Sequence, residues 1–77
     1  EAHSHFAYIN NSDIVIFDIE GEAQIRIIDA LGRCVYNGEC SDEIHRVDAA
    51  SHVLTSGVYM IQKIDDSGVN VQKIIID

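Results

Sequence analysis

Apolar and polar residues alternate along most of the chain with a period of two, which is the pattern of a half-buried β-strand. Turn residues interrupt the alternation roughly every 8–12 residues, a spacing typical of β-sandwiches and barrels. We therefore predict an all-β antiparallel fold of about seven short strands, at residues 6–10, 13–19, 23–29, 33–37, 43–48, 57–65 and 69–76. Residues 49–56 lack this alternation and predict either a loop or a single helical turn.

The dipeptide Asn37-Gly38 predicts a tight turn, and the length of that turn decides how the two cysteines are placed. A two-residue turn sets Val35 opposite Cys40 and points Cys34 to the other face of the sheet. A three-residue loop that ends with Gly38 in the left-handed region sets the two cysteines opposite each other, within reach of a disulfide. In a third interpretation, both thiols are buried and act as small apolar side chains. The sequence leaves these alternatives open.

The length and charge of the chain limit its organisation and its partners. Its 77 residues predict one domain, 1–77, in which residues 1–12 are either a linker or the first strand. A total of 13 acidic residues against 5 basic ones gives a net charge of −8, which disfavours nucleic acid and anionic membranes as partners. No apolar run reaches the roughly 18 residues of a membrane helix, so we predict no insertion into a membrane and no signal peptide. The chain starts at Glu1 rather than Met, which indicates a piece of a longer protein.

No arrangement of residues predicts catalysis or metal binding. The sequence holds no nucleophile elbow and no phosphate-binding glycine loop. Zinc-finger spacing is missing from the cysteines and the later histidines, which are Cys34, Cys40, His45 and His52. His3 and His5 could chelate a surface ion weakly, but a polar chain end is the commoner explanation, and residues 65–68 predict a hairpin turn rather than a calcium loop. We therefore predict no enzyme activity, no cofactor and no metal.

The corner at residues 29–33 has a purely structural explanation. Asp29 at the first turn position is expected to accept a backbone N–H, and Gly32 to supply the positive φ with which the chain leaves the turn. Arg33 is then expected to pair with a nearby carboxylate. Elsewhere, we expect the charges of Lys63, Lys73 and Asp77 to keep the sheet edges from pairing with other chains.

Three motifs, taken in order, resemble those of one protein family. Asp29-x-x-Gly32-Arg33 precedes an apolar run, residues 54–61 contain Gly57-Val58-Tyr59, and the chain closes with Lys73-Ile74-Ile75-Ile76. This order and spacing resemble the C-terminal sorting domain of type IX secretion cargo, the Por secretion tail family, over residues 13–77.

The resemblance extends more weakly toward the N-terminus, to Tyr8. The family usually opens with a Tyr-Pro-Asn-Pro element, of which this chain keeps Tyr8 and Asn10 but replaces the prolines with Ile9 and Asn11. Family members usually have apolar residues where this chain has its cysteines, which favours buried thiols.

The resemblance implies an immunoglobulin-like β-sandwich that serves as an address and not as a catalyst. It implies export through the periplasm, recognition by the type IX outer-membrane translocon, and delivery to the surface of a Gram-negative bacterium. A surface sortase removes the domain from many members, and some members retain it, so the implied partners are the translocon and a surface sortase or attachment complex. The residues carried over are Asp29, Gly32 and Arg33 for a presented corner, Gly57 and Tyr59 for the penultimate strand, and Lys73, Ile74, Ile75 and Ile76 for the recognised terminal strand.

Several alternatives remain beside this resemblance. The second candidate function is a non-catalytic extracellular adhesion or carbohydrate-binding module, which the absence of tryptophan and the few aromatic rings disfavour. For Tyr59, a place in the core is favoured over an anchor at an interface, and for Gly57, relief of backbone strain over contact with a partner. An exposed terminal strand allows either a monomer or a strand-swapped dimer.

Overall fold

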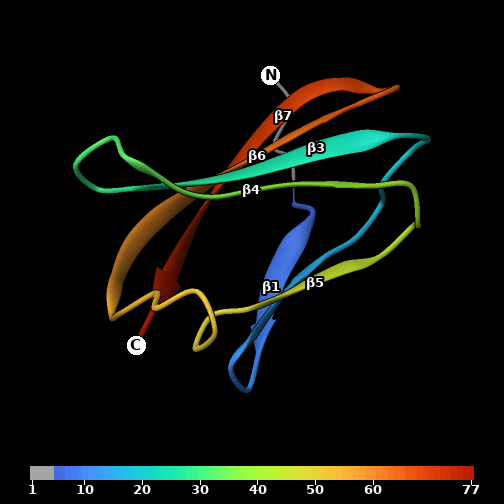
Figure 1. The fold of residues 1–77 in the computed structure, drawn as a ribbon. Helices are drawn as coiled ribbons and strands as arrows, with labels where there is room; N and C mark the ends of the chain where they lie inside the picture. The colour runs from blue at the N-terminus through green and yellow to red at the C-terminus, as the bar shows by residue number, and fades with distance from the viewer. Residues whose placement is uncertain (1–4) are drawn as a thin grey trace.

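A computed structural model describes residues 5–77, and these form seven antiparallel strands in two sheets (Figure 1). The strands are β1 (Ala7–Asn10), β2 (Asp13–Ile16), β3 (Ala23–Asp29), β4 (Cys34–Cys40), β5 (His45–Asp48), β6 (Gly57–Asp65) and β7 (Gly68–Ile76). One sheet has the order β1-β2-β5 and the other the order β4-β3-β6-β7. The prediction of an all-β antiparallel sandwich is confirmed, and the division into three and four strands is compatible with an immunoglobulin-like topology.

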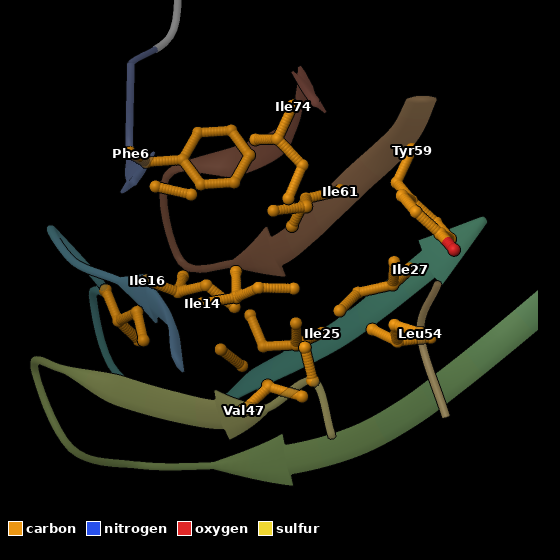
Figure 2. Close-up of a cluster of buried hydrophobic side chains, with 14 residues drawn as sticks. Phe6, Ile14, Ile16, Ile25, Ile27, Val47, Leu54, Tyr59, Ile61 and Ile74 are labelled. Carbon is orange, nitrogen blue, oxygen red and sulfur yellow. The ribbon is translucent and has the colours of Figure 1, made fainter. Parts of the chain in front are cut away.

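The core lies between the two sheets, where alternate residues of each strand point inward. Ile25 and Ile27 of β3 and Ile61 of β6 are fully buried and face Ile14 and Ile16 of β2 across the sandwich (Figure 2). The inward positions carry mostly β-branched side chains, which fit a pleated surface well. The period-two pattern therefore places the core correctly.

Strand β2 ends at Ile16, earlier than residue 19, where the sequence placed its end. Asp18 has a φ of 57°, a left-handed conformation that interrupts a strand, and at this residue the chain crosses from one sheet to the other. Phe17 N donates to Phe6 O at 2.7 Å just before this crossing. Ile19 nevertheless reaches the core from the connection.

The predicted turn at Asn37-Gly38 is wrong, because both residues lie within β4. They pair with Arg26 and Ile25 of β3, and that neighbouring strand holds the backbone extended. Glycine is needed here for space: a Cβ at Gly38 would collide with the ring and hydroxyl of Tyr36, two residues before it on the same inward face. A local turn signal has therefore been overridden by packing between strands.

The two cysteines consequently stand at opposite ends of one strand, about 20 Å apart at the rise of an extended chain. Both are free thiols, so the disulfide alternative is wrong. The buried-thiol alternative is wrong for Cys34, which is exposed, whereas Cys40 is half-buried and packs against the core. Burial, followed by the charge of Asp42, raises the pKa of the Cys40 thiol, which therefore stays protonated at neutral pH.

Residues 49–54 form a single turn that closes with the hydrogen bonds of a helix C-terminus. Of the two alternatives for this segment, a loop or a single helical turn, the structure has the turn. Leu54 N donates to Ala49 O at 2.9 Å and Val53 N donates to Ala50 O at 3.2 Å, the paired bonds of a Schellman motif. The left-handed position of this motif usually holds glycine, but here it holds Val53, with a φ of 57°. A β-branched residue is strained in that conformation.

Val53→Gly is expected to stabilise the protein by about 1 kcal/mol, because a left-handed L-residue costs roughly 1–2 kcal/mol and the flexibility of glycine offsets part of the gain. The Val53 side chain is 78% exposed, so its removal loses little packing. Thermal unfolding followed by circular dichroism should show a rise of about 4–8 °C in the midpoint. Leu31→Gly is the control, since Leu31 is equally exposed but has no positive φ. A rise of the thermal midpoint by the same amount in both variants would show that relief of backbone strain at Val53 is not the cause.

A glutamine side chain joins the two sheets where no strand does. Gln72 of β7 accepts hydrogen bonds at Oε1 from Phe6 N (2.6 Å) and Ala7 N (2.9 Å), and its Nε2 donates to Ala7 O at 2.8 Å. These are backbone groups that a neighbouring strand would otherwise pair. The start of the β1 edge is thus satisfied by one side chain from β7.

Candidate functional site

Three segments that are far apart in the sequence meet at one end of the four-stranded sheet. In the register of this sheet, Asp29 of β3 lies opposite Tyr59 of β6, and Tyr59 lies opposite Ile74 of β7. Gly57 lies opposite Ile76 in the same way. We call this region, residues 29–33, 55–60 and 73–76, the motif end of the sheet; it includes the hairpin on the left of Figure 1 and the C-terminal part of β7.

The corner at the motif end is organised by the carboxylate of Asp29. Its Oδ1 accepts hydrogen bonds from Leu31 N (3.0 Å) and Arg33 N (2.9 Å), and its Oδ2 accepts one from Arg33 Nε at 2.8 Å. Gly32 closes the turn by donating to Asp29 O at 3.0 Å, with a φ of 86° that favours glycine. The predicted turn, the positive φ of Gly32 and the ion pair of Arg33 are all confirmed. The guanidinium side chain is 71% exposed, so the corner holds Arg33 in one place without covering it.

Asp29→Asn is expected to lower the thermal midpoint near neutral pH, and its difference from wild type should shrink as the pH falls. Hydrogen bonding from the Arg33 backbone, the largest cause, outweighs desolvation and holds the pKa of Asp29 below its ordinary value of 3.8. A carboxyl with a depressed folded-state pKa stabilises the fold above its unfolded pKa, and this contribution is lost as the pH falls through the folded one. Thermal midpoints measured from about pH 7 down to about pH 2 check this.

Asp42→Asn is the control for this titration, because Asp42 is exposed in a loop. Its midpoint should stay near that of wild type at neutral pH. A difference between Asp29→Asn and wild type that is unchanged at the lowest pH would contradict a role for the charged form.

Tyr59 and Gly57 belong to the scaffold of the motif end. The Tyr59 ring is buried in the core, and its hydroxyl donates to Thr55 O at 2.7 Å, which ties the start of β6 to the preceding loop. The prediction of a core tyrosine is therefore confirmed. Gly57 has a φ of 152°, a region that favours glycine, and no side chain crowds its position apart from the edge of the Tyr59 ring. A shallow hollow lies between these residues and the corner at 29–33.

The four residues at the end of β7 point to two different faces. Ile74 faces the core and is 7% exposed, and Ile76 is half-buried on the same side. Lys73 and Ile75 point outward, and Ile75 is 57% exposed. One short motif therefore carries both packing residues and surface residues.

The opposite end of the sandwich is acidic. More than half of the acidic residues lie in or beside the β2–β3, β4–β5 and β6–β7 connections, namely Asp18, Glu20, Glu22, Glu39, Asp42, Glu43, Asp65 and Asp66. These connections lie side by side, since one pocket is lined by residues from all three. Within residues 5–77, no three histidine, cysteine or acidic side chains come close enough to hold a metal ion; His3 lies outside the described residues.

The residue that sequence reasoning missed is Lys63, which was expected at a sheet edge but is buried inside β6. Its Nζ donates to Asp18 O at 2.7 Å, lies 3.6 Å from Asp65 Oδ2, and stands 5.0 Å from the centre of the Phe6 ring. The correction follows from its place on the inward face, in line with Ile61. The period-two pattern contained this signal, because position 63 is an inward position of β6.

The comparison with protein families bears directly on these motifs. The family model of the secretion system C-terminal sorting domain matches residues 5–77. The chain belongs to this family. A search of curated proteins finds no match.

Membership in this family identifies the kind of protein. It is a C-terminal sorting signal domain of type IX secretion, a family that is in general non-catalytic. Such a domain interacts with the secretion system and directs export to the cell surface or beyond. Within residues 5–77, no helix is long and apolar enough to cross a membrane. The match also reaches past residue 13 to residue 5, so that it includes β1.

Proposed function

We propose that the sorting domain is a self-sufficient address that the outer-membrane translocon of a Gram-negative bacterium recognises in the periplasm. The translocon moves the attached cargo to the cell surface, where a sortase or attachment complex either removes the domain or leaves it in place. Residues 1–77 act as one domain in this process, without catalysis, cofactor or metal.

The observation that carries this proposal is the convergence of the three sequence motifs on the motif end. Asp29 and Tyr59 are cross-strand neighbours, and so are Tyr59 and Ile74, although the chain separates them widely. Recognition by a large partner needs a rigid surface and no cleft, and a hydrogen-bonded corner beside paired strands supplies such a surface.

The motif residues have different roles in this recognition. Asp29 and Gly32 hold Arg33 in a fixed, exposed position at the corner. Gly57, Tyr59, Ile74 and Ile76 keep β6 and β7 in register, and Lys73 and Ile75 are presented to the partner.

A transfer experiment tests the proposal. The full chain is fused to the C-terminus of an exported reporter in a type IX-competent cell, beside the reporter alone and beside the same fusion in cells that lack the translocon. We expect reporter at the surface or in the medium only for the fusion in competent cells. A version without residues 73–77 should remain in the periplasm, and its folding must be measured because this deletion removes the buried Ile74.

Retention of the full fusion in the periplasm, with the domain folded, would overturn the proposal. Equal delivery in cells with and without the translocon would overturn it as well, since export would then not depend on type IX secretion.

A further inference from the structure

The outward face of the four-stranded sheet carries a contiguous group of exposed or half-buried apolar side chains near the motif end. We call this group the outer patch; it consists of the half-buried Ile28 of β3 and the exposed Val58 and Met60 of β6 and Ile75 of β7. Cross-strand pairing makes it continuous, since Val58 lies opposite Ile75 and Ile28 lies opposite Met60. The core does not need these side chains, because their strand neighbours Tyr59, Ile61 and Ile74 already fill it.

The side chains of the outer patch on β6 and β7 are exposed. Val58 is 42% exposed, Met60 37% and Ile75 57%. Single exposed apolar residues need no explanation, but a cross-strand group of them marks an interaction surface. Nothing within residues 5–77 covers this face, since the core lies on the other side of the sheet.

The charge of this face differs from that of the rest of the molecule. Arg26 and Lys73, two of the five basic residues, border the outer patch on the same outward face. Lys73 lies directly opposite Met60, and Arg26 lies opposite Gln62, to which it donates a hydrogen bond. Cations therefore rim the outer patch on a chain whose net charge is −8.

These features define the partner by complementarity. An apolar centre with a charged rim is the anatomy of a protein interface, and the charges across such an interface are of opposite sign. A second copy of the chain fits poorly, because two-fold pairing through this face would bring the two cationic rims together.

We propose that the outer patch is the surface by which the sorting domain docks onto the secretion system, and that the docking partner presents an apolar surface rimmed by carboxylates. This inference rests on the proposed function and names the contact surface for it. The acidic end of the sandwich then faces away from the contact.

The test compares variants of the outer patch with a matched control in the reporter fusion. Ile75→Glu places a negative charge in the outer patch, and Lys73→Glu places one on its rim. Ile44→Glu is the control, because Ile44 is similarly exposed, 52% against 57% for Ile75, and lies outside the outer patch on the segment before β5. We expect delivery to fall about tenfold or more in both patch variants, the effect of losing about 1.4 kcal/mol at an interface. The control should stay within about twofold of wild type.

A second pair of variants separates charge from folding. Ile75→Lys disturbs β7 as much as Ile75→Glu but adds a charge of the same sign as the rim, so it should retain more delivery. Thermal midpoints of the purified domains should agree within about 4 °C between Ile75→Lys and Ile75→Glu.

The outcomes distinguish the two proposals. If wild type is not delivered, the proposed function fails. If wild type is delivered and the variants Ile75→Glu and Lys73→Glu are delivered equally well, the docking surface is wrong and the proposed function stands. Analytical ultracentrifugation adds one more contrary result: a wild-type dimer that Ile75→Glu dissociates would make a second copy the occupant of the outer patch.

Discussion

Lys63→Met is expected to destabilise the sorting domain by about 3 kcal/mol, which is a large share of the few kcal/mol that a domain of this size has. The ammonium group is buried with the Asp65 carboxylate 3.6 Å away, and it also donates to Asp18 O. Methionine fills the same volume but leaves that carbonyl without its donor and the carboxylate without its counter-charge. Urea denaturation followed by circular dichroism measures the loss.

Lys73→Met is the matched control, because it removes a lysine from the neighbouring strand at an exposed position. Its free energy of unfolding should stay within about 0.5 kcal/mol of wild type. Asp65 retains its hydrogen bonds from Ser67 N and from Glu20 N in the Lys63 variant, so partial structure at that end remains. Equal losses of unfolding free energy in the two variants would show that the buried contacts of Lys63 do not contribute to stability.

The second large effect separates two neighbours in the terminal strand. Ile74→Ala should cost about 2–3 kcal/mol, because Ile74 is 7% exposed and its removal leaves a cavity against the core. Ile75→Ala should cost less than about 0.5 kcal/mol, since that side chain points to solvent. Both free energies of unfolding come from the same urea titration.

This pair tests how the terminal motif is divided between folding and recognition. The two substitutions are chemically identical and adjacent, so differences in strand propensity largely cancel. Losses of equal size would mean that the alternation of β7 does not decide burial there. Delivery of the Ile75→Ala fusion can then be interpreted without a correction for stability, whereas delivery of the Ile74→Ala fusion cannot.

The sequence allowed the fold class, the strands and the local corner to be predicted, because each depends on short-range signals. Alternation located β3, β6 and β7 with their inward residues. The turn at residues 29–33 followed from Asp29 and Gly32, whose bonds stay within five residues.

The failures share a different physical origin, which is contact between distant segments. Asn37-Gly38 has the composition of a turn, yet pairing with β3 and the Tyr36 ring hold it extended. Lys63 is charged, as residues at exposed sheet edges often are, yet its ammonium group is buried and donates a hydrogen bond to a carbonyl of the β2–β3 connection. The assembly of the motif end also depends on register, which the alternation alone does not determine.

The attachment of β1 through Gln72 has a mechanical consequence. Cargo precedes a C-terminal sorting domain in the chain, so any tension that the cargo transmits enters at β1. The first links that such tension loads are the Gln72 side-chain bonds, the bond from Phe17 N to Phe6 O and a four-residue ladder to β2, which open one after another from the Phe6 end. The four-stranded sheet, with the motif end and the outer patch, lies beyond those links. A pulled cargo can thus peel away the first strand while the surface presented to the secretion system keeps its shape.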